Sequence, residues 1–177
     1  MVGNSAGGQG SASATTFAQM SAFGSSALNV TTVTGDAFGY NALSANTTGA
    51  SNCAFGNQSM LNNTTGGQCC AFGYEALETN VTGSQLTAMG YKCLNKATSG
   101  PNTGIGYNSL ASLTTGTNCV AHGGSTGASL TTGSYNTLLG TSAGSAYTSS
   151  ESSNILIGSG VNGTVGENNV LRIGNTQ

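Results

Sequence analysis

The chain has 177 residues, of which 5% are charged and 37% hydrophobic, and its formal net charge is −2. Ordinary soluble domains carry about a quarter charged residues, so this composition is unusual for a globular domain and favours a repetitive, hydrogen-bonded structure. Three basic residues are too few to follow a phosphate backbone or an anionic membrane surface. We therefore expect no nucleic-acid partner and no membrane partner.

Residues 1–20 are rich in Gly, Ser, Ala and Thr and contain no repeat. We interpret them as a lead-in or junction segment, followed by one repeat domain over residues 21–177. The first residues form neither the basic region nor the apolar segment of a secretory signal. We expect either a fragment or export by another route, such as assembly into a virion, and hence an extracellular, cell-surface or virion location.

A repeat of about 17 residues fills the rest of the chain. Three consecutive copies begin at Asp36, Cys53 and Cys70, and each continues Ala-Phe-Gly. A unit of this length is too short for a helical repeat or a propeller blade, and it suits one coil of a parallel β-solenoid. The sequence predicts an all-β solenoid of nine to ten coils. The marking glycine recurs at Gly24, Gly39, Gly56, Gly73, Gly90, Gly106, Gly123, Gly140, Gly158 and Gly174.

Two apolar columns follow from this alignment. Four residues after the glycine stands a column of long apolar side chains, and just before the glycine stands a second column, which we predict to point inward. Two residues before this second column stands the Cys53–Cys70 column, which strand alternation places on the same face of the sheet as the second column. A column of Ala lies between the two, and its small side chains would let another chain approach closely. The predicted core ladders are Phe38, Phe55, Phe72, Met89, Ile105 and His122, and Leu43, Leu77, Leu94 and Leu110.

The predicted core offers about four apolar side chains in each coil. Coils this small usually need disulfides or partner chains for stability. We therefore expect three chains wound side by side, with end-to-end joining as a further option because an uncapped coil exposes a sheet edge.

The stretch Gly39-Tyr-Asn-Ala-Leu-Ser-Ala-Asn-Thr-Thr-Gly-Ala-Ser-Asn52 resembles the Asn/Thr/Gly repeats of phage and giant-virus tail-fibre proteins and of the heads of trimeric autotransporter adhesins. The segments that begin at Asn154 and Asn169 are similar to the region that precedes the chaperone domain of such fibres. The resemblance covers about residues 22–177. It implies a homotrimeric left-handed β-roll that acts as a fibre shaft or adhesive head, although the 17-residue period and the Phe and Cys columns depart from the adhesin pattern.

Catalytic chemistry has few candidate residues. His122 is the only histidine, and a Ser-His-Asp arrangement would need Asp36, which lies five coils away. At about 4.8 Å for each coil, the separation is roughly 24 Å, far outside hydrogen-bond reach. A three-fold axis could gather three copies of His122 around Zn or Ni, but we favour a ladder position. We predict no enzyme activity, no cofactor and no metal.

The cysteines and tyrosines form further columns. Cys53 and Cys70 occupy one column of adjacent coils, within disulfide range, although free thiols that pack as small hydrophobes are the favoured interpretation and interchain bridges stay open. Glu75 and Lys92 are predicted to pair on the surface. A column of stacked tyrosines could stabilise the fold or contact glycan: Tyr40, Tyr74, Tyr91 and Tyr107.

Three asparagines recur at one turn position within Asn-x-Thr sequons, and we note them as possible N-glycosylation sites: Asn46, Asn63 and Asn80. The sequence favours a structural or adhesive fibre whose partner is itself, with a cell-surface glycan or receptor as a further partner. The alternative is an ice- or glycan-binding solenoid that uses the Thr columns or the Tyr column. Ice binding ranks lower, because the Thr pairs are adjacent and precede a glycine, which favours turns.

Overall fold

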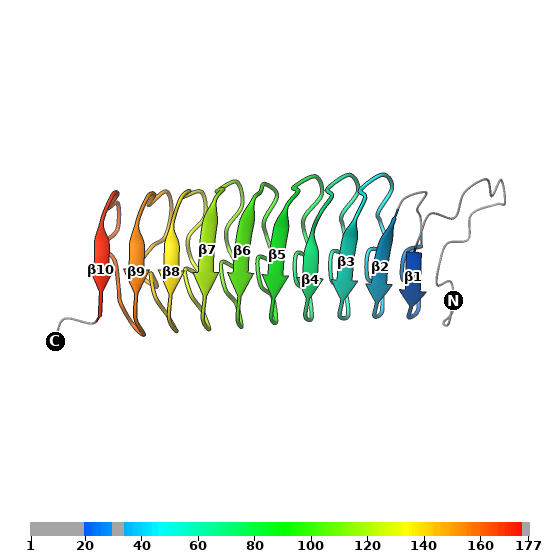
Figure 1. Cartoon of the computed structure of the whole chain (residues 1–177), viewed down its shortest axis with the longest axis horizontal. Helices are drawn as coiled ribbons and strands as arrows, with labels where there is room; N and C mark the ends of the chain where they lie inside the picture. The colour runs from blue at the N-terminus through cyan, green and yellow to red at the C-terminus, as the bar shows by residue number, and fades with distance from the viewer. Residues whose placement is uncertain (1–19, 30–33, 175–177) are drawn as a thin grey trace.

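The computed structural model describes residues 20–29 and 34–174. Residues 1–19 of the predicted lead-in lie outside the described residues. The described part of the chain forms one parallel sheet of ten strands, which follow one another in chain order (Figure 1). The strands are β1 (Met20–Phe23), β2 (Gly35–Phe38), β3 (Asn52–Phe55), β4 (Cys70–Phe72), β5 (Leu86–Met89), β6 (Asn102–Ile105), β7 (Cys119–His122), β8 (Thr137–Leu139), β9 (Ile155–Ile157) and β10 (Leu171–Ile173).

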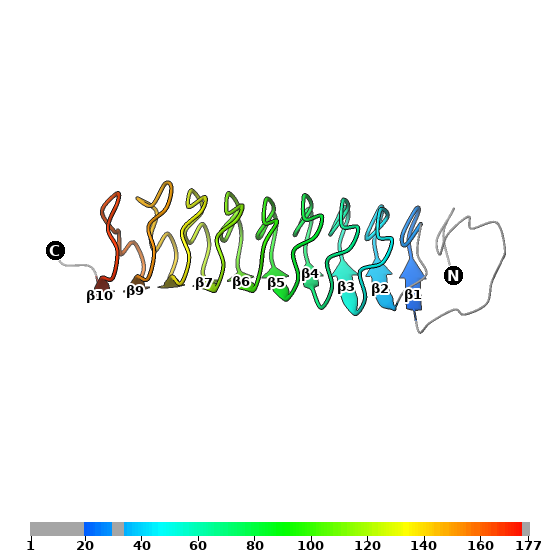
Figure 2. The same cartoon turned by 90° about the horizontal axis from the view of Figure 1, so that it is seen from above.

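Each strand is one side of a coil, and the coils stack along a single axis (Figure 2). Equivalent residues of successive coils are partners in the sheet. Cys53 pairs with Cys70, and Phe55 pairs with Phe72. The sequence columns are therefore real columns of side chains, and the predicted all-β parallel solenoid is confirmed.

Glycine is required at two corners of the coil for different reasons. Gly73 has a φ of 143°, which L side chains rarely adopt, and a Cβ there would lie 2.3 Å from the carbonyl oxygen of Gly90. Gly66 lies at the other corner, ten residues after Gly56, and a Cβ there would lie 2.3 Å from the carbonyl oxygen of Gly83. Gly73 is thus required by both its positive φ and its crowding, and Gly66 by crowding.

The segment after the corner is not a strand, yet it bonds to both neighbouring coils. The amide of Gln58 donates to Tyr40 in the preceding coil, and the amide of Met60 donates to Ala76 in the following coil. Both residues have positive φ, 58° and 50°. The segment therefore bonds backward through Gln58 and forward through Met60, which ties each coil to both of its neighbours.

The core contains the long apolar column but not the Phe column. The leucine ladder is confirmed, because its members have no exposed surface: Leu43, Leu77, Leu94 and Leu110. In the strands, the Ala column points inward and is buried, whereas the residues before the corner glycine point outward. The inward placement of this second ladder was wrong: Phe38, Phe55 and Ile105 are half-buried on the outside, and Phe72, Met89 and His122 are exposed.

The reason for this inversion is the narrowness of the coil. At Gly104, which belongs to the Ala column, a Cβ would lie 2.6 Å from Sγ of Cys93 and 3.2 Å from Cγ of Leu94. The interior therefore has room for one long column faced by one small column. A phenyl ring cannot fit there, so the large residues lie outside.

Candidate interaction surfaces

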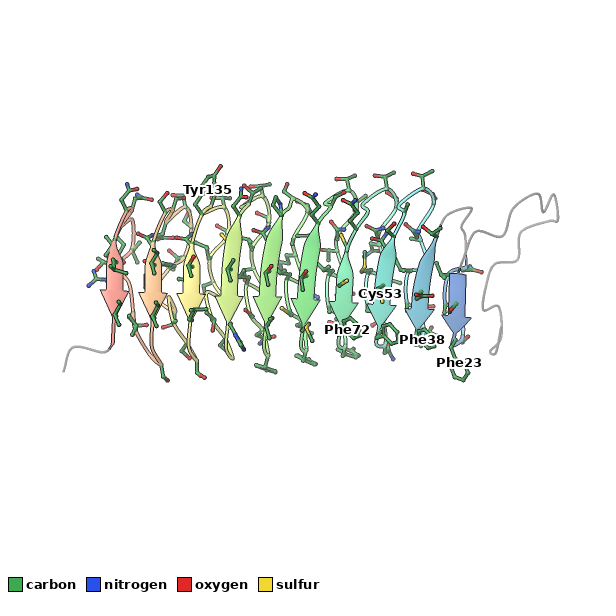
Figure 3. The ribbon with its side chains drawn as sticks, viewed as in Figure 1. Phe23, Phe38, Cys53, Phe72 and Tyr135 are labelled. Carbon is green, nitrogen blue, oxygen red and sulfur yellow. The ribbon has the colours of Figure 1, made fainter. Side chains whose placement is uncertain are left out.

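The outward side chains of β3–β9 form one continuous surface, which we call the outer stripe. None of them is Asp, Glu, Lys or Arg, and several large ones are well exposed, including Met89 at 45%, Val120 at 42% and Ile155 at 42%. Figure 3 shows Phe23, Phe38 and Phe72 along one rim of the sheet and Cys53 on the strand above that rim. The outer stripe consists of Cys53, Phe55, Cys70, Phe72, Thr87, Met89, Thr103, Ile105, Val120, His122, Thr137, Leu139, Ile155 and Ile157.

Aromatic rings at the N-terminal end of this rim stack on one another. The ring centroids of Phe38 and Phe55 lie 4.5 Å apart, and those of Phe55 and Phe72 lie 4.8 Å apart, with nearly parallel planes. Stacked aromatic pairs contribute about 0.5–1.5 kcal/mol beyond their area burial. The ladder therefore stabilises the single chain while leaving the outer edges of its rings uncovered.

A second aromatic column lies on the other side of the corner glycine. Tyr74, Tyr91 and Tyr107 stack with centroid distances of 5.4 and 5.3 Å. Tyr40 belongs to the same column, is 51% exposed, and is separated from Tyr74 by Asn57. Because the stacked rings cover one another's faces, they present mainly edges and hydroxyls to solvent. Glycan contact by this column stays a prediction.

The predicted surface pair is present beside these tyrosines. Nζ of Lys92 lies 3.1 Å from the Glu75 carboxylate and 5.4 Å from the centre of the Tyr91 ring. Hydrogen bonds from Tyr74 and Lys92 lower the pKa of Glu75 against a smaller opposing effect of burial. The pair is partly exposed, so its contribution to stability is small.

All five cysteines are free thiols. Cys69, Cys93 and Cys119 are buried, and burial raises the pKa of each, that of Cys93 to about 12. Cys53 and Cys70 are register partners but form no disulfide, and both face outward on the stripe. The predicted packing of this column as small buried hydrophobes was wrong, since Cys53 is half-buried and Cys70 is exposed, and interchain bridging stays a prediction.

His122 and Asp36 lie on β7 and β2, five strands apart, so they form no catalytic pair within one chain. Asp36 accepts a hydrogen bond from the Ser21 amide at 3.0 Å and borders a polar hollow of 480 Å³ beside β1–β3. Among residues 20–29 and 34–174, no group of three or more His, Cys, Asp or Glu is placed to hold a metal ion. The same part of the chain contains no helix long and apolar enough to cross a membrane.

The proposed glycosylation sites are buried, so this prediction was wrong for the folded chain. Asn46, Asn63 and Asn80 have no exposed surface. Nδ2 of Asn63 donates to Oδ1 of Asn46 at 2.9 Å, and Nδ2 of Asn80 donates to Oδ1 of Asn63 at 2.9 Å. The amide nitrogens that would carry a glycan are instead used in hydrogen bonds: those of Asn63 and Asn80 bond to the preceding coil, and that of Asn46 bonds to the Gly49 carbonyl of its own coil.

A second buried asparagine column was not predicted from the sequence. Asn52, Asn102, Asn136 and Asn154 begin or precede strands, and each links adjacent coils. Asn102, for example, accepts from the Cys119 amide at 2.9 Å and donates to the Gly116 carbonyl at 2.8 Å. The available signal was the return of Asn to the same position of the repeat, although Cys69, Leu86 and Cys119 occupy that position in the intervening coils.

The threonine pairs lie in bends, as predicted. The first threonine of a pair donates its hydroxyl to the backbone of the next coil, from Thr47 to Thr64 at 2.9 Å and from Thr114 to Thr131 at 2.9 Å. These hydroxyls act within the solenoid. The arrangement is not the flat alternating Thr-x-Thr face on a strand that ice binding would favour.

The last coils contain a charged cluster that the sequence reasoning missed. Nη2 of Arg172 lies 2.7 Å from Oε2 of Glu167, and the Tyr147 hydroxyl donates to Oε1 of Glu167 at 2.7 Å. Glu151 is 1% exposed and accepts from the amides of Ser149 and Gly166, both at 3.0 Å. In these last coils, where the repeat becomes irregular, the side chains of the cluster link neighbouring coils.

Comparison of this chain with protein-family models, with curated proteins and with solved structures found no match in any of the three.

Proposed function

We propose that this chain is a structural fibre protein: a homotrimeric β-solenoid shaft or head that can join end to end into extracellular or virion filaments. The observation that carries the proposal is the unbroken parallel sheet of ten strands in a single register. Ten strands about 4.8 Å apart make a rod of roughly 43 Å. Each of the strands β2–β9 bonds to the strand before it and the strand after it, which suits a rod that must resist unfolding along its length.

The distribution of side chains supports a mechanical role. Hydrogen bonds inside the rod use the asparagine columns and the first threonine of each pair. The exposed outer stripe offers apolar area for packing and contains no Asp, Glu, Lys or Arg. The first and last strands, β1 and β10, each have one neighbouring strand in the described structure, and such sheet edges favour addition of further strands.

The test is negative-stain microscopy of the purified chain together with its mass by light scattering. We expect rods of three times 17.3 kDa, or uniform threads if rods join at their ends. A compact particle of 17.3 kDa at all concentrations would overturn the proposal. In that case, binding of ice or glycan by the threonine and tyrosine columns becomes the next hypothesis to measure.

A further inference from the structure

We propose that the outer stripe is the surface where copies of this chain meet, side by side, parallel and in register. This inference rests on the proposed fibre and identifies the residues that hold its chains together. It begins from the inverted strands. Because the large residues point outward, the core is already closed by the leucine and alanine columns, and in the described part of the chain several residues of the outer stripe stay exposed.

Together with the outward residues of the adjoining β10, the stripe is large enough for a specific interface. Exposed fractions on the outward sheet face include 39% for Phe72, 36% for Ile157 and 63% for Leu171. At about 150–200 Å² for each large side chain, the outward apolar residues of the stripe and of the adjoining β10 expose on the order of 600 Å². A standard interface takes about 800 Å² from each partner, and contiguous apolar patches of this size mark interaction surfaces.

The chemistry of the stripe selects another copy of the chain as the partner. From β3 to β9 it presents no Asp, Glu, Lys or Arg, so a charged peptide, a nucleic acid or an anionic lipid finds no counter-charge. Its side chains repeat once per strand, at about 4.8 Å. An α-helix, with a pitch of about 5.4 Å, loses register within a few turns. A second solenoid has the same spacing and matches every coil.

The borders of the stripe also fit an interface. On the far side of the corner glycine, the hydroxyls of the stacked tyrosines and the Glu75–Lys92 pair supply a polar edge. Interfaces commonly combine an apolar centre with such a rim.

Asp36 favours the parallel orientation. It lies on the outward face of β2, just outside the charge-free stretch. A full antiparallel overlap would set its carboxylate against the aliphatic residue Ile155 of β9, where burial of a charge without a partner is costly. A parallel arrangement sets it beside its own counterpart, beyond the stripe and at the polar hollow of β1–β3, where the Ser21 amide and solvent accommodate the charge.

The natural cysteines provide the first test. The variant Cys53→Ser keeps Cys70 as its outward thiol, while Cys69, Cys93 and Cys119 stay buried. A short bis-maleimide should then link Cys70 of one chain to Cys70 of its neighbour and give covalent dimers on a denaturing gel. The matched control combines Cys53→Ser and Cys70→Ser with Thr115→Cys, which puts the thiol on an exposed bend away from the stripe and should give none. Equal cross-linking in both variants would overturn the inference.

Orientation has its own control. In an antiparallel overlap, β4 faces β7, so adding Val120→Cys to Cys53→Ser would raise cross-linking strongly. In the parallel arrangement the new thiol adds only linkage to its own counterpart, three strands from Cys70. Mapping of the linked peptides separates the cases, and a Cys70–residue 120 link between chains would overturn the parallel register.

The second test places a charge on the stripe. Met89→Glu should reduce the mass in light scattering to that of one chain, 17.3 kDa, without loss of the β signal in circular dichroism. Thr115→Glu adds the same charge on an exposed bend and should leave the assembly intact. If rods or threads form but Met89→Glu leaves their mass unchanged and Cys70 does not link, the fibre stands and the stripe inference fails. A wild-type chain that is monomeric would overturn both the proposed fibre and the stripe inference.

Discussion

Single buried amides hold neighbouring coils together. Asn63 is the middle of a three-residue ladder: Nδ2 donates to Asn46 and to the Gly66 carbonyl, and Oδ1 accepts from Asn80. In later coils the same column is filled by Ala97, Leu113 and Leu130, all buried. The column is therefore either fully hydrogen-bonded or fully apolar, and a half-satisfied ladder is the unfavourable state.

Asn63→Ala should lower the free energy of unfolding by about 2–4 kcal/mol, because it leaves Nδ2 of Asn80 and Oδ1 of Asn46 buried without this partner, at about 1–3 kcal/mol each. Chemical denaturation followed by circular dichroism measures the change. Asn57→Ala, at an exposed turn position, is the matched control and should stay within about 0.5 kcal/mol. If the two variants lost the same free energy of unfolding, the asparagine ladder would contribute no more to stability than an exposed turn residue.

At the scale of the coil, the inward strand column and the turn column that faces it change in opposite ways along the rod: where one has a large side chain, the other has a small one. In coils β2–β5 the strand supplies Ala and the turn supplies Leu or Met. In coil β8 the strand supplies Leu138 and the turn supplies Gly144. A Cβ at Gly144 would lie 3.1 Å from Cδ1 of Leu138, so the long side chain now comes from the opposite wall.

A double-mutant cycle tests this exchange. Leu138→Ala should cost about 2–5 kcal/mol through the cavity it leaves, and Gly144→Leu alone should cost about 1–3 kcal/mol through overpacking. The double variant restores the arrangement of the earlier coils, where Leu43 and Leu77 also have positive φ. We expect its loss of stability to be clearly smaller than the sum of the two single losses. Additive losses in denaturation experiments would mean that the columns do not share one space.

The same exchange explains what the sequence could and could not predict. The 17-residue period, the ten strands and the buried leucine column follow from spacing alone. Alternation in a strand shows that Ala54 and Phe55 face opposite ways, but not which of them lies inside. Hydrophobicity favours Phe, whereas the narrow interior admits only Ala or Gly wherever the facing turn supplies Leu or Met. The signal that could have decided was the paired change at Leu138 and Gly144, since only columns that touch compensate each other's volume.

Polar features were harder to predict because their partners lie in other coils. The Asn46, Asn63 and Asn80 sequons suggest a surface turn, yet the amides bond 17 residues away into the core. The Glu167 cluster joins residues 5 and 20 positions apart across coils of irregular length. No fixed period relates them, so the alignment of repeats could not bring them together.

At the scale of the whole molecule, the rod is quasi-one-dimensional, and its stability depends on contacts between neighbouring coils. Opening at an end therefore costs less than opening in the middle. At the C-terminal end the resistance comes from Glu167 with Arg172 and Tyr147, and from buried Glu151, which accepts three backbone N–H groups. These backbone hydrogen bonds lower the pKa of Glu151 despite the opposing effect of its burial.

Acid should consequently open the described rod from this end. The hydrogen bond from Arg172, reinforced by Tyr147, lowers the pKa of Glu167 from its ordinary value of 4.5 to about 2, against the opposing effect of burial. Between these values the unfolded carboxyl takes up a proton and the folded one does not. The stabilisation is therefore complete above about pH 4.5 and is lost as the pH falls through about 2. Hydrogen exchange should show the amides of β9 and β10 losing protection before those of β4–β6.

Glu167→Gln supplies the decisive comparison, because it removes the charge that Arg172 pairs with at every pH. The variant should open its last coils already at neutral pH, and the additional loss between pH 4.5 and 2 should shrink. Glu75→Gln breaks the Lys92 pair in the middle of the rod and should leave the order of opening unchanged. If β4–β6 exchanged as early as β10 in the wild-type chain, the ion cluster would not protect the end, and acid would act on the rod as a single cooperative unit.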